Sequence, residues 1–216
     1  MGSDEERTTK ALKGRRILII EDDKDLTLRL KELFESCGVR SVSVKRCVRG
    51  ARQGGLDILL KRGDDFDLIC VDIMLPWSER DLKECQVLQR EWNQLLKEVA
   101  KLREKRASGD DLAEQRDRLN KLSQEIRARI DREAGIKMIQ HWRQEMSKKA
   151  GGQWSPKAAI LILTAHLKDE SLAAGLAEFT RRTRWITKPA FQWQVLTAAA
   201  ELLDDATQAR GGNECH

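Results

Sequence analysis

The sequence predicts an α/β protein, built as a doubly wound, five-stranded parallel sheet and interrupted once by an antiparallel α-helical hairpin. Three observations carry this prediction. Short apolar runs alternate along the chain with segments of helical periodicity. The run at residues 66–74 is apolar at consecutive positions, as in a parallel strand covered on both faces. One long block, after the third strand, departs from the alternation and has helical periodicity alone.

The β-α units follow one another in a regular order. Leu26, Leu30, Leu33 and Phe34 mark the first helix, which Gly38 ends. The expected strands lie at 16–20, 42–44, 66–74, 158–163 and 184–186. The later helices are expected at 48–62, 136–146, 171–178 and 191–203. Five such units imply right-handed crossovers and helices on both faces of a parallel sheet.

The inserted block, residues 79–133, contains no proline and only Gly109 as glycine. Apolar residues form a first stripe at Leu88, Trp92, Leu95, Val99 and Leu102 and a second at Leu112, Leu119, Leu122, Ile126 and Ile130. Two antiparallel helices of roughly 35 to 40 Å, with a turn at 107–110, account for both stripes. We expect the stripes to be the core of a coiled-coil-like hairpin rather than an intermolecular seam. The second helix is expected to continue into the helix at Ile136.

These patterns divide the chain into a charged N-terminal segment, a core in two parts, an insert and a tail. The segment covers residues 1–14, and the two core parts cover 15–77 and 135–209. The insert covers 78–134, and the tail covers 210–216.

Composition restricts the class of protein. With 40% apolar residues the chain can bury a core, and no apolar run is long enough to span a membrane or to act as a secretory signal. The net charge is +5, but the charges of both signs are interspersed, so nucleic-acid binding is not indicated. The basic residues near Arg182 are expected to form a solvated turn. Five scattered cysteines argue against disulfides and zinc, and favour a cytoplasmic location.

The chemistry-bearing residues lie where the expected strands end. Glu21 and Asp22 follow the first strand, Asp72 ends the third, Thr164 follows the fourth and Lys188 follows the fifth. In a doubly wound sheet these ends share one edge, where ligands bind. Three crowded carboxylates favour a hard divalent cation, and an oxygen-only ligand set favours Mg²⁺. One carboxylate is then able to attack a phosphoryl group whose charge the metal and the lysine offset, while the hydroxyl donates to it.

Four segments resemble the signature segments of the response-regulator receiver family of two-component signalling, whose fold is flavodoxin-like. They occur in the family's order at 19–23 (IIEDD), 71–76 (VDIMLP), 163–165 (LTA) and 187–189 (TKP). The resemblance implies that Asp72 is the phosphoacceptor and that Lys188 binds the phosphoryl group. It further implies a Mg²⁺ site formed by Glu21, Asp22, Asp72 and the backbone carbonyl of Met74. Thr164 and Trp185 match the family's switch hydroxyl and switch aromatic, and Asp23 is expected to start a helix rather than to bind metal.

The insert is the main departure from the family, because it lies between Asp72 and Gly135, the expected first glycine of the third helix. An aspartyl phosphatase is disfavoured because Met74 stands where that class has a second acid. Two functions remain: a phosphorelay receiver that is not itself an enzyme, and a phosphorylation-independent scaffold that displays the hairpin. Expected partners are a histidine kinase or phosphotransfer protein, a protein that binds the hairpin, and a second copy of the chain. We expect no DNA-binding domain.

Overall fold

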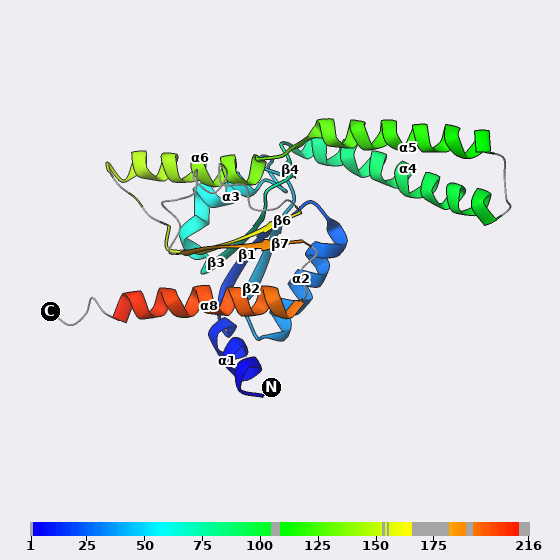
Figure 1. Ribbon diagram of the computed structural model, residues 1–216. Coiled ribbons are helices and arrows are strands. Elements are labelled where there is room, and N and C mark those ends of the chain that lie inside the picture. Colours follow the sequence, from blue (N-terminus) through cyan, green and yellow to red (C-terminus); the bar gives the residue numbers. More distant parts are fainter. Residues whose placement is uncertain are drawn as a thin grey trace.

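A computed structural model describes residues 2–104, 109–152, 154, 156–165, 182–188 and 192–211 (Figure 1). The expected helix at 171–178 and residues 107–108 of the expected turn lie outside this part of the chain. The described strands are β1 (Arg16–Ile20), β2 (Ser41–Lys45), β3 (Leu68–Asp72), β4 (Leu75–Pro76), β5 (Ile130–Asp131), β6 (Ala159–Thr164) and β7 (Thr183–Thr187). The described helices are α1 (Gly2–Leu12), α2 (Lys24–Ser36), α3 (Gly55–Arg62), η1 (Gly63–Asp65), α4 (Glu79–Glu104), α5 (Gly109–Arg129), α6 (Ala134–Lys149) and α8 (Gln192–Gly211).

Five parallel strands form the central sheet in the order β2-β1-β3-β6-β7. The chain moves outward from β1 in one direction and then crosses back over β1, so helices cover both faces. The predicted doubly wound parallel sheet is therefore confirmed. All five strands end at the same edge of the sheet, and this arrangement brings residues that are distant in sequence together.

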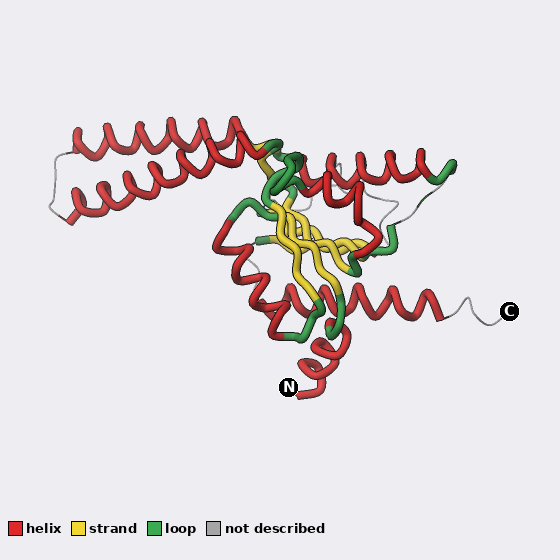
Figure 2. Tube along the Cα trace, turned by 180° about the vertical axis from the view of Figure 1, so that it is seen from behind, coloured by secondary structure: helices red, strands yellow, loops and turns green. Residues whose placement is uncertain are grey.

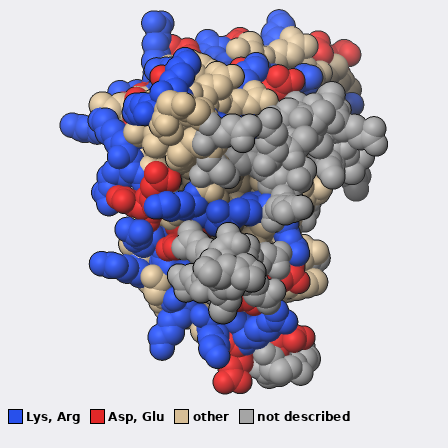
Figure 3. Space-filling model, turned by 90° about the vertical axis from the view of Figure 1, so that its left-hand side faces the viewer, with Lys and Arg blue, Asp and Glu red and all other residues tan. Residues whose placement is uncertain are grey.

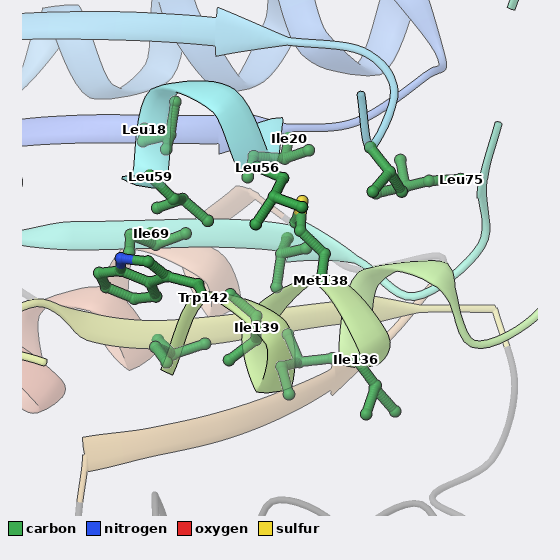
Figure 4. Close-up of a cluster of buried hydrophobic side chains, with 14 of the residues drawn as sticks. Leu18, Ile20, Leu56, Leu59, Ile69, Leu75, Ile136, Met138, Ile139 and Trp142 are labelled. Carbon is green, nitrogen blue, oxygen red and sulfur yellow. The ribbon is translucent and has the colours of Figure 1, made fainter. Parts of the chain in front are cut away.

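Alternation along each strand sends side chains into two separate cores. Leu18, Ile20 and Ile69 point toward α3 and α6, and Trp142 of α6 is fully buried there (Figure 4). Ile17 and Ile19 point to the opposite face, where α2 and α8 pack. Strands covered on both faces explain why these apolar runs are continuous in the sequence.

The second predicted helix is shorter than expected and begins at Gly55 rather than at Val48. The prediction was wrong for residues 48–54 because their backbone bonds elsewhere. The amides of Val48 and Arg49 donate to the carbonyls of Pro76 and Trp77, at 3.0 and 2.8 Å. Gly50 has a φ of 152°, a conformation that residues with a side chain rarely adopt.

The N-terminal segment forms a helix that the sequence analysis did not anticipate. Most of α1 is polar and exposed, but Leu12 at its end is fully buried in the same core as α2 and α8. Arg7 of α1 also pairs with Asp204 of α8, at 3.2 Å. The segment 1–14 is therefore packed on the sheet's helical layer, although its sequence shows only two apolar residues at the contact.

The insert consists of α4 and α5, which lie side by side and antiparallel and extend away from the sheet (Figures 1 and 2). Each residue of both predicted stripes is buried or half-buried, including Leu95, Val99 and Leu122. The stripes thus form the core of the hairpin itself, as predicted. At 26 residues, α4 is about 39 Å long.

The second arm does not continue into the helix at Ile136, which corrects the sequence prediction. After Arg129 the chain forms β5, which pairs antiparallel with β4: Leu75 lies opposite Asp131, and Pro76 opposite Ile130. This two-stranded ladder joins the two ends of the insert. It forms because Leu75 is fully buried, which holds the chain extended before α4 begins.

Side-chain contacts fix the start of α4 to the core. The carboxylate of Glu79 accepts hydrogen bonds from the amides of Arg52 and Gln53, at 2.7 and 2.8 Å. Glu84 of α4 pairs with Arg129 at the end of α5, at 2.9 Å. The hairpin is therefore attached through several bonds rather than through a flexible hinge.

Lys and Arg side chains predominate at the end of the molecule away from the hairpin, in agreement with the net charge of +5 (Figure 3). In the part of the chain that the structure describes, no helix is both long enough and apolar enough to cross a membrane. The four described cysteines, Cys37, Cys47, Cys70 and Cys85, are free and buried.

Replacing Leu12 with alanine tests whether α1 is part of the core. Leu12 is 0% exposed, so Leu12→Ala is expected to lower the free energy of unfolding by about 2 to 5 kcal/mol. Leu28, on α2, is 53% exposed, and Leu28→Ala is expected to cost less than about 0.5 kcal/mol. Urea denaturation followed by circular dichroism measures both. Equal costs for the two variants would show that α1 does not pack on the core.

Candidate functional site

A cleft of about 820 Å³ lies at the carboxyl edge of the sheet. Five of the predicted site residues line it: Glu21, Asp22, Asp72, Met74 and Lys188. Thr164 ends β6 beside them and is only 1% exposed. The structure thus brings together the ends of β1, β3, β6 and β7, as the sequence analysis expected from parallel topology.

The loop between β1 and α2 positions Glu21 and Asp22. The Glu21 amide donates to the carbonyl of Lys45 at 3.0 Å, which continues the β1–β2 ladder by one residue. Asp23 caps α2, since its side chain accepts from the amides of Asp25 and Leu26 at 2.8 and 3.0 Å. Asp23 therefore starts the helix, as predicted, and leaves Glu21 and Asp22 facing the cleft.

Asp72 is held by two donors at the floor of the cleft. The ammonium group of Lys188 donates to Asp72 Oδ2 at 2.9 Å and to Glu21 Oε2 at 2.6 Å. The backbone amide of Met74 donates to Asp72 Oδ1 at 3.2 Å. Lys188 is positioned in turn by its own amide, which donates to the Thr164 carbonyl at 2.5 Å. One lysine therefore bridges the ends of β1 and β3.

Burial and mutual repulsion shift the ionisation of these groups. Burial, together with the charge of Asp72, raises the pKa of Glu21 to about 8, although Lys188 opposes the shift. Burial and Asp72 likewise raise the pKa of Asp22 to about 6. Burial lowers the pKa of Lys188, but the carboxylates of Asp72 and Glu21 outweigh it, so the pKa stands above its usual value. The positive charge of Lys188 alone does not offset the mutual repulsion of the three carboxylates.

The arrangement fits a hard divalent cation. Glu21, Asp22 and Asp72 each offer a carboxylate oxygen, and these oxygens all lie within 4.8 Å of one another. Oxygen donors of this kind suit Mg²⁺, and a bound cation would reverse the raised pKa values of the two acids. The role expected for the Met74 carbonyl stays a prediction, although Met74 lines the same cleft.

Gly135 lies against Asp72 despite the long insert between them. A Cβ atom at Gly135 would stand 2.0 Å from the carbonyl oxygen of Asp72, and the Gly135 amide donates to the Ile73 carbonyl at 2.9 Å. No residue with a side chain fits this approach. The β4–β5 ladder therefore returns the chain to the position from which α6 starts directly beside the phosphoacceptor candidate.

Sequence reasoning missed two contributions to the cleft. Arg46, just after β2, donates from its guanidinium to the backbone carbonyl of Asp22. Its position at the end of a strand was the available signal. Polar residues of α4 also line the cleft: Gln86, Gln89, Arg90 and Asn93. Their spacing of three and four residues marks one helix face, but nothing in the sequence shows what this face meets.

Two further expectations have separate outcomes. Trp185 lies in β7, is partly buried and packs against the core that contains Trp142, so its switch role stays a prediction. Among the basic residues near Arg182, Arg182 donates to the carbonyls of Pro156 and Lys157, and the exposed Arg184 pairs with Glu201. The solvated turn stays a prediction, because Arg181 lies outside the described residues.

Comparison with known families finds no matching family, and no curated protein matches the sequence. Solved structures do match. NtrX from Brucella abortus in complex with ADP has 11% identity and a TM-score of 0.51, over 94% of this chain and 30% of that chain. The signal receiver domain of a LuxO-like repressor from Vibrio parahaemolyticus has 16% identity and a TM-score of 0.48, over 94% and 98%. A response regulator receiver domain from Clostridium thermocellum has 14% identity and a TM-score of 0.46, over 91% and 97%.

At such identities the likeness concerns the fold. Together with the strand order β2-β1-β3-β6-β7, the match to part of NtrX at a TM-score of 0.51 gives the class: the chain has a doubly wound, flavodoxin-like α/β fold. The pair α4 and α5 is an addition to this fold.

The raised pKa values make a testable prediction about stability. An acid whose pKa is higher in the folded state than in the unfolded state binds more protons when the protein is folded. Its contribution to stability therefore becomes less favourable as pH rises from the unfolded-state pKa to the folded-state pKa. For Asp22 this interval runs from 3.8 to about 6. In the presence of EDTA, Asp22→Asn should therefore become more stable than the unsubstituted protein as pH rises through this interval, and then level off.

Thermal denaturation at a series of pH values measures the difference, with Asp64→Asn, an exposed acid on η1, as the control. Mg²⁺ should stabilise the unsubstituted protein more than Asp22→Asn. A difference that is independent of pH and of Mg²⁺ would contradict both the raised pKa and the metal site.

Proposed function

We propose that this chain is a phosphoacceptor receiver of a phosphorelay, which takes a phosphoryl group from a phosphohistidine donor onto Asp72. One observation carries the proposal. A buried carboxylate at the end of a central strand is held by a lysine and lies within 4.8 Å of two further carboxylates that have raised pKa values. This set combines a nucleophile, a cation for the phosphoryl oxygens and ligands for a metal.

The chemistry follows from these positions. A carboxylate oxygen of Asp72 attacks phosphorus and forms an acyl phosphate, while the bond between phosphorus and the donor imidazole nitrogen breaks. The imidazole leaves with the electron pair and takes up a proton. Lys188 is already within 2.9 Å of Asp72 and offsets the charge of the phosphoryl oxygens, and the hydroxyl of Thr164 donates to one of them. Glu21, Asp22, Asp72 and the Met74 carbonyl would hold Mg²⁺, which would supply further positive charge beside the phosphoryl oxygens.

Signalling then passes through protein contacts. The proposed donor is a histidine kinase or a phosphotransfer protein, and the proposed outputs are a protein that binds the hairpin and a second copy of the chain. Thr164 and Trp185 act as the switch residues in this proposal. The chain is proposed to work in the cytoplasm as an acceptor, not as an enzyme that acts on a separate substrate.

A phosphorylation-independent scaffold is the second candidate. One observation favours it: α4 exposes Val87 and Leu96, at 55% and 38%, so the hairpin presents apolar side chains independently of the cleft. Loss of output in a variant that cannot be phosphorylated would favour the receiver, whereas unchanged output would favour the scaffold.

The phosphoacceptor is tested by labelling with a small donor. Incubation with Mg²⁺ and phosphoramidate is expected to add one phosphoryl group, which mass spectrometry detects. Asp72→Asn should abolish the label because an amide is not a nucleophile for phosphorus, whereas Asp64→Asn should be labelled like the unsubstituted protein. Continued labelling of Asp72→Asn would move the site to another residue.

The hairpin is tested by shortening it. Replacing residues 94–119 with a short Gly/Ser turn removes the outer part of α4 and α5 but keeps Glu79, the β4–β5 ladder and the residues that line the cleft. The shortened chain should fold and should be labelled at Asp72, because no group of the site lies in the deleted part. If the hairpin is the output surface, the shortened chain should also lose binding to partner proteins or self-association.

Sedimentation with and without beryllofluoride, which mimics the phosphoryl group, measures self-association of the shortened and full-length chains. A folded shortened chain that is not labelled would show that the outer hairpin contributes to the chemistry. Equal self-association of both chains would show that the hairpin is not the surface for a second copy.

A further inference from the structure

Three successive carbonyl groups of the loop between β1 and α2 accept hydrogen bonds, and the middle one is bonded from a different element. The hydroxyl of Thr27 donates to the carbonyls of Glu21 and Asp23, at 3.2 and 2.6 Å. The carbonyl of Asp22 instead accepts from the guanidinium of Arg46, which directly follows β2. The loop that carries two of the three candidate Mg²⁺ ligands is therefore held both from α2 and from the end of β2.

The two peptide groups that flank Asp22 are both fixed. Because a peptide group is planar, a bond to its carbonyl orients its amide as well. The group before Asp22 is held by the Thr27 hydroxyl at the Glu21 carbonyl. The group after Asp22 is held by Arg46 at its carbonyl, and its amide, that of Asp23, donates to Glu21 Oε1 at 3.3 Å. These bonds set the direction of the Cα–Cβ bond of Asp22, and hence the place of its carboxylate.

The backbone of Arg46 is fixed in turn by the insert. Its amide donates to the carbonyl of Gln53 at 3.0 Å. The amides of Arg52 and Gln53 donate to the carboxylate of Glu79, the first residue of α4, at 2.7 and 2.8 Å. The side chain of Glu79 lies so close to Gly50 that a Cβ atom there would stand 2.4 Å from Glu79 Cγ. A continuous series of hydrogen bonds thus leads from the start of the insert, through the turn after β2, to the backbone of a candidate metal ligand.

Neither stability nor charge accounts for an arginine at this place. The Nε atom of Arg46 is buried and, among the described residues, has no hydrogen-bond partner, which is unfavourable for a donor. The side chain lines the cleft together with Asp22 and Asp72, where a positive charge repels a bound metal ion. The bond to the Asp22 carbonyl is the contact through which Arg46 is able to favour metal binding.

We propose that Arg46 is a positioning residue for the Mg²⁺ ligand Asp22, and that Glu79 of the insert holds the turn from which Arg46 reaches it. This inference rests on the proposed function, in which Glu21, Asp22 and Asp72 bind Mg²⁺, and it gives the insert a part in that site. Arg46 acts on the metal through the backbone of Asp22 and does not touch the reacting atoms.

The test measures Mg²⁺ affinity from the rise in melting temperature with Mg²⁺ concentration, which requires no phosphoryl donor. Arg46→Met keeps an unbranched side chain without donors and should weaken Mg²⁺ binding about tenfold, as does the loss of other groups that orient metal ligands. Charge alone predicts the opposite sign, because removing a cation near the site strengthens the binding of Mg²⁺. Arg46→Lys restores a charged donor on a shorter side chain and should recover part of the lost affinity.

Lys24→Met is the matched control, because Lys24 is an exposed cation that lines the same cleft from the start of α2. Its removal should leave the Mg²⁺ affinity unchanged or raise it. Equal losses of affinity in Lys24→Met and Arg46→Met would overturn the positioning role. If Arg46→Met does not fold, Arg46→Lys carries the test, and an affinity equal to that of the unsubstituted protein would overturn the role.

The contribution of the insert is tested at Glu79. Glu79→Ala removes the acceptor for the amides of Arg52 and Gln53 and should weaken Mg²⁺ binding several-fold. Glu79→Gln keeps an acceptor oxygen and should bind Mg²⁺ like the unsubstituted protein. In the double variant of Glu79→Ala and Arg46→Met the losses should not add, because both act through the same bond to Asp22. Additive losses, or unchanged binding in Glu79→Ala, would overturn the role of Glu79.

Mg²⁺ binding by the unsubstituted protein tests the proposed function independently of these variants. If the unsubstituted protein does not bind Mg²⁺, the proposed metal site is overturned, and this inference with it. If Asp22→Asn weakens Mg²⁺ binding while Arg46→Met binds Mg²⁺ as tightly as the unsubstituted protein or more tightly, the metal site stands and the positioning role of Arg46 is overturned.

Discussion

Three carboxylates crowded around one lysine are the constraint on which the rest of the site depends. Glu21, Asp22 and Asp72 come from two strands, and their repulsion is only partly offset by Lys188. The folded protein tolerates this repulsion because the apolar surface buried on both faces of the sheet stabilises the strands and so holds their ends together. The mutual repulsion of the three carboxylates is the reason that the cluster suits a hard divalent cation.

The parallel strand order places these carboxylates and their partners at one edge of the sheet. In the order β2-β1-β3-β6-β7, the strands that carry the acids are central neighbours, and β6 and β7 place Thr164 and Lys188 next to them. Any antiparallel arrangement would send some of these residues to the opposite edge. The two cores, one on each face, make the strands rigid supports for the side chains at their ends.

The insert is accommodated without displacing the site because its two ends meet. The β4–β5 ladder closes the insertion, and Gly135 then approaches the Asp72 carbonyl too closely for any side chain. The hairpin adds its own apolar core, so it does not draw on the core of the sheet. An insertion that returns the chain to its starting point costs little beyond loop closure, which grows slowly with length.

The sequence by itself determined the order of the five sheet strands and of the described helices that alternate with them, the antiparallel hairpin and the meeting of Glu21, Asp22, Asp72, Thr164 and Lys188, because periodicity and strand ends are local properties of the chain. It did not determine the packing of α1, the extended course of residues 48–54 or the β4–β5 ladder. Only the tertiary structure decided these, and with them which face of α4 lines the cleft. The physical reason is that each depends on backbone or side-chain partners distant in sequence, whose positions no local pattern encodes.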